Sequence, residues 1–177
     1  MSGDHIKSLS PEEFKKLTDF KIVYGTVDTP FGKCLIGLNQ NRVCFSAFYD
    51  GKAPVADISK LFPNAELEEN NEEVTKVAGK SFDPENKVDV LLKGTDFEVN
   101  VWKQLTNLKK GSTYSYEHVA KALNNPKAIR AVARAVAKNN VSYLIPCHRV
   151  ISKSGGLSKY KWGAERKLKI LKHENAI

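Results

Sequence analysis

Three segments with strand composition, separated by two short turns, set the strongest limit on how this chain can fold. Residues 21–27, 33–38 and 42–48 are rich in β-branched and aromatic side chains, which favour an extended backbone. The connections, 28–32 and 39–41, consist largely of residues that favour turns. Strands joined by such short connections pair with their neighbours in the sequence. The sequence therefore predicts an antiparallel meander.

The rest of the first 94 residues carries weaker signals. Ser10, followed by a proline and two glutamates, has the pattern of a helix start with a capping box, and we expect that helix to end near residue 20. A short helix over 54–61 and a strand over 87–92 complete the expected elements. The acidic run over 66–73 is interpreted as a solvated, mobile face rather than as a metal site.

A longer helix is predicted to open the second half of the chain. Residues 95–98 repeat the capping-box pattern, and Gly111 marks the expected end of the element. Four apolar residues recur at helical spacing and are predicted to face the core: Phe97, Val101, Leu105 and Leu108. Trp102 is interpreted as a packing residue rather than as a platform for base stacking.

Two further helices are predicted over 116–123 and 126–139, joined by a turn that contains Asn124, Asn125 and Pro126. On the second helix, four basic residues fall within one narrow arc: Lys127, Arg130, Arg134 and Lys138. Three apolar residues are predicted to point the opposite way: Ile129, Val132 and Val136. Alanines fill most other positions, so little bulk separates the backbone from whatever the basic face contacts. This pattern is typical of a helix-turn-helix.

Charge is distributed unevenly along the chain. The net charge is +8, but residues 1–94 hold 12 Lys/Arg against 15 Asp/Glu, whereas residues 95–177 hold 16 against 5. A basic half of this kind favours a polyanionic partner, and nucleic acid is the usual one. A lysine-rich surface that serves only solubility is the alternative. We place the expected domain boundary at Gly94, where the composition changes.

The three cysteines and the hydropathy exclude several classes of protein. Cys34 and Cys44 fall within the expected strands, where a small buried hydrophobe is the predicted role. An odd number of widely spaced cysteines, without an apolar export signal, predicts free thiols in a reducing compartment. No apolar run approaches the length of a membrane span. No pair of cysteines has C-x-x-C spacing, so no metal site is expected.

The stretch from Leu144 to Val150 has the composition of a reactive site. It contains two bulky aliphatic residues and a proline, and then Cys147, His148 and Arg149 without a spacer. A cysteine attacks as its thiolate and needs a base or a nearby positive charge to form it. We expect His148 and Arg149 to supply both and the apolar residues to fix Cys147 in place. The alternative is a buried cysteine at a strand end, with the histidine and arginine facing solvent.

The basic helix and the cysteine lie close together in the sequence. A helix ending near Asn139 leads almost directly to the candidate nucleophile Cys147. A protein thiol cannot reach a base inside a duplex unless the nucleotide rotates out of the stack into a pocket. The combination predicts a protein that flips a base and attacks a group on it.

These motifs together resemble one family, the O6-alkylguanine-DNA alkyltransferases (methylated-DNA–protein-cysteine methyltransferases). The resemblance rests on residues 146–150, on residues 124–132 and on Asn139. It extends from about residue 95 to residue 174 and includes Phe97, Trp102, Ser115-Tyr116, Lys167-Leu168, Leu171 and His173-Glu174. The first half is similar more faintly, through Tyr24 and the turn over 29–32.

The resemblance implies an α+β fold with two domains. Residues 1–94 would form an antiparallel, ribonuclease-H-like sheet with flanking helices. Residues 95–177 would form a mostly helical domain with the helix-turn-helix and the Pro-Cys-His-Arg turn. It also implies direct DNA repair without a cofactor or a metal. Cys147 would accept the alkyl group from O6 of a flipped guanine and keep it as a thioether, so each molecule would act once.

The resemblance assigns roles to five residues of the reaction centre. A proton relay would run from Cys147 through a water to His148 and on to Glu174. In that relay the carboxylate orients the imidazole, and the imidazole draws the thiol proton. Tyr116 would meet the negative charge that develops on the leaving guanine and would press on the DNA backbone during flipping. Lys167 would assist at O6.

The resemblance also assigns the DNA surface and the substrate pocket. Arg130 would enter the stack where the guanine has left, and Asn139 would act as a hinge between the recognition helix and the active-site turn. The remaining contacts with the minor groove are expected from Lys127, Arg134, Lys138, Ala128, Ala131, Ser115 and Asn125. The residues expected to line the pocket are Pro146, Val150, Tyr160, Lys161 and Trp162. For Asn139, a helix C-cap is an equally good interpretation.

One departure from the family bears on the substrate. Lys161-Trp162 occupies a stretch of the pocket loop where many members have small residues. We expect Trp162 to narrow or cap the pocket, which would favour methyl over bulky benzyl-type adducts.

Two other classes of protein remain as alternatives. A non-catalytic binder of alkylated DNA would keep the basic helix but lack the cysteine, and Cys147 argues against it. A cysteine hydrolase would draw its histidine from a distant segment and has no use for a helix-turn-helix. The expected partner is double-stranded DNA containing O6-alkylguanine, bound by a monomer in the nucleus or the cytoplasm without any membrane association.

Overall fold

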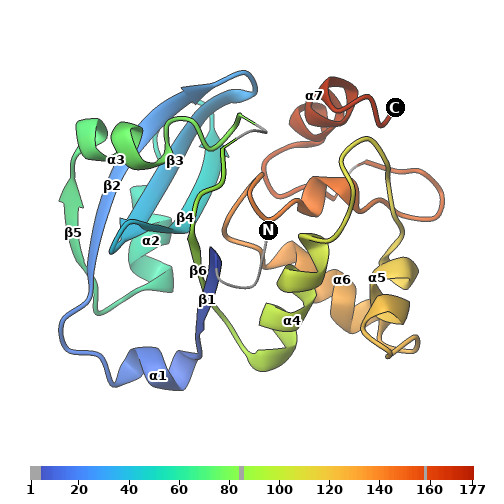
Figure 1. Ribbon diagram of the computed structural model, residues 1–177, viewed down its shortest axis with the longest axis horizontal. Helices are drawn as coiled ribbons and strands as arrows, with labels where there is room; N and C mark the ends of the chain where they lie inside the picture. Colours follow the sequence, from blue (N-terminus) through green and yellow to red (C-terminus); the bar gives the residue numbers. More distant parts are fainter. Residues whose placement is uncertain (1–4, 84–85, 158) are drawn as a thin grey trace. The chain divides into compact units, whose positions relative to one another are not determined.

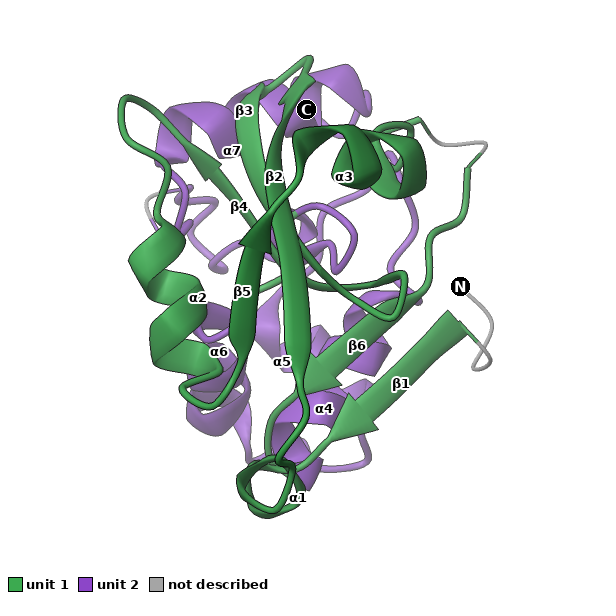
Figure 2. Cartoon of the chain, turned by 90° about the vertical axis from the view of Figure 1, so that its left-hand side faces the viewer, with its two compact units in different colours: residues 1–95, 140–142 green, residues 96–139, 143–177 purple. Residues whose placement is uncertain are grey.

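The computed structural model describes residues 5–83, 86–157 and 159–177 and confirms the α+β fold class (Figure 1). The chain divides into two compact units (Figure 2). Unit 1 contains residues 1–95 and 140–142, and unit 2 contains residues 96–139 and 143–177. None of the helices in the described part of the chain has the length and apolarity needed to span a membrane.

Unit 1 is built on one six-stranded sheet with the strand order β1-β6-β4-β3-β2-β5. The strands are β1 (Ile6–Leu9), β2 (Lys21–Thr29), β3 (Gly32–Asn39), β4 (Arg42–Tyr49), β5 (Glu66–Glu69) and β6 (Val90–Lys93). The predicted antiparallel meander is confirmed as β2–β3–β4. Gln40 and Asn41, between β3 and β4, have φ values of 49° and 64°. Two consecutive positive φ values give the twist that a two-residue hairpin needs.

The sheet is mixed rather than wholly antiparallel, because three short strands extend the meander. β5 pairs with β2 in parallel, and β6 pairs in parallel with β1 and, at Val43–Val90, with β4. The acidic run over 66–73, expected to be mobile, instead forms β5 and the start of a helix. Its glutamates are mostly exposed, as predicted. Charged side chains on an edge strand also discourage pairing with another chain.

The described residues of unit 1 form three α-helices: α1 (Pro11–Lys15), α2 (Val55–Leu61) and α3 (Asn71–Ala78). The capping box at Ser10 is confirmed, but α1 ends at Lys15 and not near residue 20. The chain has to leave the helix there because Phe20 is needed in the core. The rings of Phe14, Phe20 and Phe62 form a cluster with centroid separations of 5.3 to 5.6 Å, a spacing typical of favourable aromatic contacts.

Unit 2 is mostly helical, as predicted, with α4 (Asp96–Leu105), α5 (Tyr116–Ala122), α6 (Ile129–Ala137), the 3-10 helix η2 (Cys147–Arg149) and α7 (Ala164–His173). α4 ends at Leu105, six residues before Gly111. Val101, Leu105 and Leu108 are buried, as expected, but Phe97 is only half-buried. Trp102 is a packing residue, as predicted, and its indole N–H donates to the carbonyl of Ala135 on α6 at 2.8 Å.

The pair α5 and α6 forms the predicted helix–turn–helix arrangement, with one shift in its boundary. Ser115 caps α5, because its hydroxyl accepts from the N–H of His118 at 3.1 Å. α6 begins at Ile129 and not at Pro126. Residues 125–128 form a separate turn, closed by a hydrogen bond of 3.0 Å from the N–H of Ala128 to the carbonyl of Asn125. This turn delays the first helical residue.

Residues 140–142 belong to unit 1, although we expected everything after residue 94 to form one domain. The N–H of Ser46 donates to the carbonyl of Asn140, and the N–H of Ser142 donates to the carbonyl of Ser46, both at 2.9 Å. The two serine hydroxyls lie 2.9 Å apart, and Cys34 Sγ lies 3.2 Å from that of Ser46. β6 pairs with β4 only at Val43. The backbone of β4 near Ser46 therefore does not pair with β6, and residues 140–142 supply its hydrogen-bond partners instead.

Candidate active site

The backbone around Cys147 makes two tight turns in succession. The N–H of Cys147 donates to the carbonyl of Ile145 at 2.8 Å across Pro146, whose φ and ψ are −81° and 62°. These values are those of an inverse γ-turn. The 3-10 helix η2 follows at once and is closed by a 3.2 Å bond from Val150 N–H to the carbonyl of Cys147. Ile145 is fully buried, so the expected apolar anchor before the cysteine is confirmed.

Asn139, at the end of α6, holds the cysteine turn through its side-chain amide. The Nδ2 group donates to the carbonyl of Ile145 at 3.0 Å and to Cys147 Sγ at 3.3 Å. The C-cap of α6 is Lys138, so the alternative interpretation of Asn139 as the cap is wrong. Asn139 is 1% exposed. Its position therefore links the end of α6 directly to the thiol.

Burial, and not the neighbouring charges, dominates the acidity of Cys147. The side chain is 6% exposed. Burial raises the pKa of the Cys147 thiol above its ordinary value, and the hydrogen bond from Asn139 and the charge of Lys167 only partly oppose the rise. We expected the adjacent residues to make this cysteine acidic, and that expectation is wrong. Cys147 rests as a thiol and needs a base to remove its proton.

His148 and Glu174 form a buried pair beside the cysteine turn. His148 Nε2 lies 3.1 Å from Glu174 Oε2, and neither side chain is exposed. Burial lowers the pKa of His148, and Glu174 only partly restores it. Burial alone would raise the pKa of Glu174, but hydrogen bonds from His148 and Arg149, together with their charges, lower it to about 2. The pair is therefore a neutral imidazole and a carboxylate at neutral pH.

The carboxylate determines which imidazole nitrogen is basic. A carboxylate only accepts hydrogen bonds, so Nε2 of His148 carries the proton and donates it to Glu174 Oε2. The other nitrogen, Nδ1, then has a free lone pair. It is buried and has no hydrogen-bond partner among the described residues. The site thus contains a neutral base. The hydrogen bond from Nε2 to Glu174 determines that Nδ1 is the nitrogen that can accept a proton.

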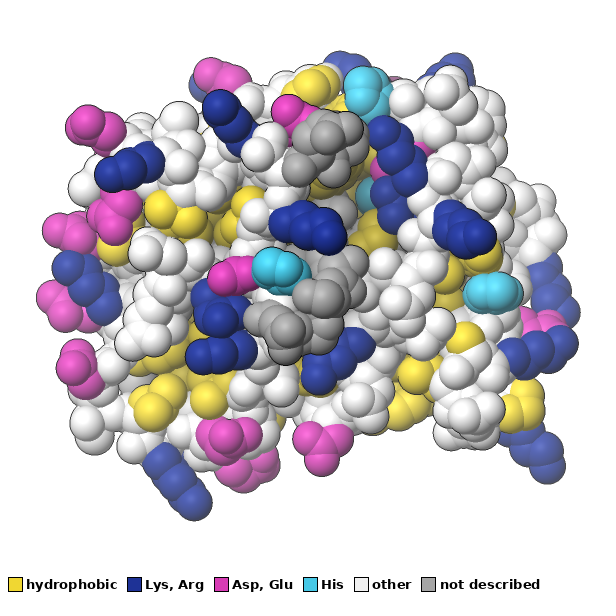
Figure 3. Space-filling model, in the orientation of Figure 1, with side chains coloured by type: hydrophobic (Ala, Val, Ile, Leu, Met, Phe, Trp, Pro, Cys, Tyr) yellow, Lys and Arg dark blue, Asp and Glu magenta, His cyan; other side chains and the backbone are white. Residues whose placement is uncertain are grey.

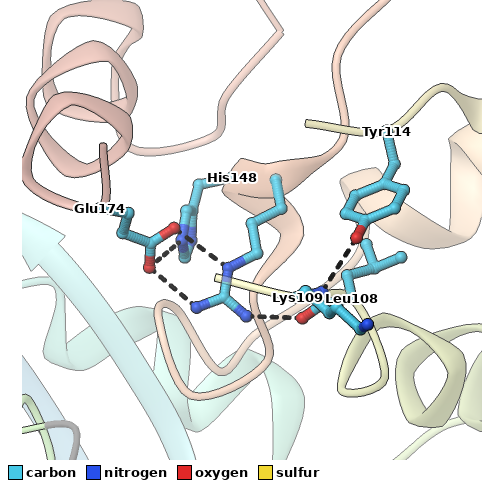
Figure 4. A network of polar contacts seen from close by, with 6 residues as sticks. Leu108, Lys109, Tyr114, His148 and Glu174 are labelled. Carbon is cyan, nitrogen blue, oxygen red and sulfur yellow. Dashed lines mark hydrogen bonds and ion pairs between the residues drawn. The ribbon is translucent and has the colours of Figure 1, made fainter. Parts of the chain in front are cut away.

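Arg149 does not supply charge to the thiol as we expected. Its Nε donates to Glu174 Oε1 at 3.0 Å and its Nη2 to Glu174 Oε2 at 2.8 Å, while Nη1 donates to the carbonyl of Leu108 at 2.8 Å (Figure 4). The guanidinium is thus hydrogen-bonded to Glu174 and to the Leu108 carbonyl, and not to the Cys147 thiol. This arrangement, with His148 buried, also excludes the alternative in which both side chains face solvent.

Lys167 and Tyr116 supply two further polar groups that are coupled electrostatically to the thiol. Lys167 is 2% exposed on α7, and its ammonium donates to the carbonyl of Val150 at 2.7 Å. Burial lowers the pKa of Lys167, and the charge of Cys147 opposes this. Tyr116 is half-buried at the start of α5; burial and then Cys147 raise its pKa. Both side chains are hydrogen-bond donors at neutral pH.

Of the five residues expected to line the pocket, Pro146 and Val150 are buried on either side of η2, and Tyr160, Lys161 and Trp162 lie together before α7. The rings of Tyr160 and Trp162 meet edge to face with centroids 5.2 Å apart. Lys161 Nζ lies 5.7 Å from the centroid of the Trp162 ring, and Arg166 Nη1 donates to the Trp162 carbonyl at 2.8 Å. Tyr160 is buried, whereas the Trp162 ring is half-exposed. The indole is therefore held in place with part of its surface accessible.

The four basic residues predicted on this helix are exposed: Lys127, Arg130, Arg134 and Lys138. Arg130 and Arg134 lie within α6, whereas Lys127 lies in the turn before it, because the helix begins only at Ile129, and Lys138 is its C-cap. Lys138 forms an ion pair with Glu98 at 3.5 Å. Val132 and Val136 are buried, as predicted, but Ile129 is 38% exposed, so its predicted inward position is wrong. Ile129 is the first residue of α6, and the buried residues of the helix begin one turn later, at Val132.

The remaining candidate DNA contacts lie around the turn between α5 and α6. Asn125 is exposed, while Ser115, Ala128 and Ala131 are half-buried. The hydroxyl of Ser115 already caps α5. On the face drawn in Figure 3, acidic side chains gather over β5 and α3. The uneven charge of the sequence is thus visible on the surface of unit 1.

The structure places two residues around His148 in ways that the sequence does not predict. Arg149, expected to act on the thiol, directs its three hydrogen bonds to Glu174 and Leu108. The ring of Tyr143 stacks on the imidazole of His148 with centroids 5.8 Å apart and planes 11° apart. Tyr143 has a φ of 67°, a value rare outside glycine and asparagine. No local pattern in the sequence signals either contact.

Comparison with known proteins identifies the family. Residues 96–176 match the family model described as 6-O-methylguanine DNA methyltransferase, DNA binding domain. The methylated-DNA–protein-cysteine methyltransferase of Methanosarcina acetivorans is 32% identical over 157 residues, which cover 86% of this chain and 98% of that protein. The chain belongs to the methylated-DNA–protein-cysteine methyltransferase family. This membership confirms the resemblance found in the sequence.

Solved structures of the family share the fold. The crystal structure of the Mycobacterium tuberculosis O6-methylguanine methyltransferase matches with a TM-score of 0.71 and 28% identity, over 87% of this chain and 93% of that one. A crystal structure of the M. tuberculosis protein OGT in complex with DNA matches with a TM-score of 0.70 and 28% identity, over 86% of this chain and 92% of that one.

Other relatives are longer than this chain. The regulatory protein Ada of Salmonella typhimurium is 33% identical over 180 residues, which cover 97% of this chain but 51% of that protein. The match to the Escherichia coli Ada protein covers 85% of this chain and 45% of that protein. The match to the Kluyveromyces lactis methyltransferase is confined to about half of each protein, 49% of this chain and 46% of that one. The chain therefore spans about half the length of the two Ada proteins.

Proposed function

We propose that this protein repairs alkylated DNA by moving the alkyl group from O6 of guanine to Cys147, once per molecule. The observation that carries the proposal is the buried set formed by Cys147, Asn139, His148 and Glu174 in a chain of this family. It provides a nucleophile, a neutral base and a carboxylate that fixes the base. We also propose that the protein acts as a monomer on double-stranded DNA.

The proton of the thiol is proposed to pass to Nδ1 of His148. Cys147 rests as a thiol, so a base has to accept that proton as the sulfur attacks. In the relay that the family resemblance implies, a water carries the proton to the imidazole. Glu174 then stabilises the imidazolium through Oε2. The S–C bond forms as the bond between the alkyl carbon and O6 breaks, and the electron pair leaves with guanine.

Tyr116 and Lys167 are proposed to meet the charge that develops on the leaving guanine. A departing guanine anion needs hydrogen-bond donors or a proton. The raised pKa of the Tyr116 phenol keeps it protonated. The Lys167 ammonium is held by the carbonyl of Val150, next to the cysteine turn. Among the described residues, neither group is hydrogen-bonded to a carboxylate that would compete with the leaving guanine.

The exposed basic face of α6 is the proposed DNA-binding surface. Its alanines leave the backbone close to the groove, and its cations contact phosphates, which supply most of the affinity of such proteins. Arg130 is proposed to fill the space that the flipped guanine leaves, because a side chain that replaces the stacked base offsets part of the cost of flipping. The exposure of Arg130 near the start of the helix suits this role.

Arg130→Ala is expected to slow repair of duplex DNA by about tenfold to a hundredfold, the scale of the flipping cost. Its effect on free O6-methylguanine base should be small, because no stack has to be refilled. Single-turnover rates on both substrates measure the difference. Arg42→Ala, a matched arginine substitution in unit 1, should leave both rates unchanged. Equal losses on duplex and free base after Arg130→Ala would contradict the intercalating role.

Trp162→Gly is expected to speed the reaction with a bulky O6-benzylguanine adduct by about tenfold, the size of effect that a pocket wall has on substrate choice. The half-exposed indole, held by Tyr160 and by the main-chain bond to Arg166, is proposed to limit the space for the alkyl group. The rate on O6-methylguanine should change little. An unchanged rate on the bulky adduct would show that Trp162 does not limit the space for the alkyl group.

The proposed function is tested by incubating the protein with duplex DNA that contains one O6-methylguanine. We expect the intact mass of the protein to rise by one CH2 group, as the thiol proton is replaced by a methyl group. The yield should not exceed one methyl per molecule even with excess DNA. Binding of the lesion without any change in mass would support the non-catalytic lesion binder instead.

A further inference from the structure

Arg149 is the only described residue seen to bind both oxygens of the Glu174 carboxylate. It donates Nε to Oε1 at 3.0 Å and Nη2 to Oε2 at 2.8 Å. The Arg149 side chain is 15% exposed and the Glu174 side chain is not exposed at all. Buried two-point contacts of this kind combine energy with a fixed orientation, because the planar fork matches the carboxylate.

The guanidinium is itself held from the other side. Its third nitrogen, Nη1, donates to the carbonyl of Leu108, in the turn after α4, at 2.8 Å (Figure 4). The same turn is stabilised by a hydrogen bond of 3.3 Å from the N–H of Lys109 to the Tyr114 hydroxyl. Arg149 therefore connects the turn between α4 and α5 to Glu174, the C-cap residue of α7. It cannot rotate without breaking a bond at one of these places.

This geometry determines how Glu174 meets His148. The imidazole supplies a single contact, from Nε2 to Oε2 at 3.1 Å. A carboxylate held by one bond can rotate about its terminal torsion, which has a broad energy profile. With both oxygens bound by Arg149, Oε2 stays directed at Nε2. The proton then stays on Nε2, and Nδ1 keeps its lone pair.

Three charged groups act on His148, and Arg149 opposes the strongest of them. Glu174 raises the pKa of His148, whereas Arg149 and Lys167 lower it, and burial lowers it most. A carboxylate facing a buried imidazole alone would favour the imidazolium, which has no lone pair to accept a proton. The positive charge of Arg149 partly neutralises the negative charge of the Glu174 carboxylate. His148 is thereby kept neutral before the reaction.

We propose that Arg149 is a positioning residue for the alkyl-transfer reaction: it fixes the Glu174 carboxylate and balances its charge, so that His148 presents a neutral Nδ1 as the base. The inference rests on the proposed function. It adds a role that neither the Cys-His pair nor the His-Glu contact accounts for by itself.

The test compares Arg149→Met, Arg149→Lys and the control Arg42→Met in the full chain. The imidazole pKa of His148 is measured by NMR titration, and the single-turnover rate of methyl transfer from O6-methylguanine duplex DNA is measured across pH. In Arg149→Met the loss of positive charge should raise the pKa of His148 by about one unit. Because neutral His148 is the active form, the acid limb of the rate profile should move to higher pH by a similar amount.

Arg149→Lys separates charge from orientation. Lysine keeps the positive charge but offers a point contact instead of a planar fork. The pKa of His148 should stay near the wild-type value, while transfer at neutral pH should slow by about tenfold or more, within the range that a general base contributes. The control should match wild type in both measurements. If Arg149→Met does not fold, the lysine variant still decides, because a wild-type transfer rate would overturn the proposal.

The failure of this inference is distinguishable from failure of the proposed function. A purely structural role for Arg149 predicts a rate loss of the same size at every pH and an unshifted His148 titration, and that result would overturn the inference. Absence of methyl transfer in the wild-type protein would reject the proposed function instead. The NMR titration would still report whether Arg149 controls the acidity of His148.

Discussion

Replacement of Cys147 by alanine is expected to abolish alkyl transfer, with a loss of about a thousandfold or more, the scale seen when an enzyme loses its nucleophile. The sulfur is the only atom at the site that can form a stable thioether with the alkyl carbon. His148, Glu174 and Arg149 should keep their mutual contacts in this variant, because the hydrogen bonds that join them do not involve Cys147. The measurement is methyl transfer from O6-methylguanine duplex DNA under single-turnover conditions.

Cys44→Ala is the matched control for that experiment. Cys44 is a buried cysteine in β4, its thiol donates to the carbonyl of Gly37 at 3.6 Å, and burial raises its pKa to about 12. Among the described residues, no histidine is hydrogen-bonded to the Cys44 thiol. The variant should transfer methyl groups at the wild-type rate. Residual transfer by the Cys147 variant would mean that another residue accepts the group.

Replacement of Glu174 by glutamine is expected to destabilise the protein by about 3 kcal/mol at neutral pH, because it leaves the buried partners His148 and Arg149 without their anion. The carboxylate accepts three hydrogen bonds from these two residues. The lowered pKa of Glu174, about 2, is consistent with a stabilising contribution from these hydrogen bonds to the folded protein. Urea denaturation of wild type and variant at neutral pH measures the difference.

The same substitution should change how stability depends on pH. The pKa of Glu174 is depressed from an ordinary 4.5 to about 2 in the folded protein. Its contribution is therefore present above pH 4.5 and is lost as the pH falls through the folded-state value. The stability of Glu174→Gln should depend less on pH in this window. Methyl transfer should also slow, because His148 loses the carboxylate that fixes its proton on Nε2.

Glu117→Gln provides the control for the stability measurement. The pKa of Glu117 is also lowered to about 2, by hydrogen bonds and charges from Lys121 and Lys153. Its side chain, however, is 24% exposed and its partners are 63% and 75% exposed. Solvent screens such pairs, and they contribute little to stability. If both glutamine variants lost the same stability, burial of the Glu174 pair would not be the cause.

The sequence was most informative where one local rule decided the structure. The β2–β3–β4 meander followed from β-branched segments and from turn residues such as Asn41, whose φ of 64° suits asparagine. The cap at Ser115 and the buried stripe of α4 also followed from local patterns. β1 and β5 were missed because four-residue strands acquire their structure from the neighbour with which they pair, and that neighbour is distant in the chain.

Within the candidate site, the arrangement of the side chains depends on contacts between residues that are distant in the sequence, so local patterns could not predict it. Glu174 lies 26 residues after His148, and only the resemblance to the family brought the two together. The acidity expected of Cys147 was wrong because adjacency in the sequence does not place a charge near a thiol. Arg149 turns toward Glu174, and burial dominates the pKa of the sulfur. Desolvation depends on the packing of the whole unit.

The central claim is that one sulfur atom receives the alkyl group, and peptide mapping tests it most directly. The wild-type protein is incubated with duplex DNA containing O6-methylguanine, digested and analysed by mass spectrometry. We expect one added CH2 group on the peptide that contains Cys147, with the Cys34 and Cys44 peptides unmodified. A methyl group on any other residue, or unmodified Cys147 after the lesion has been repaired, would contradict it.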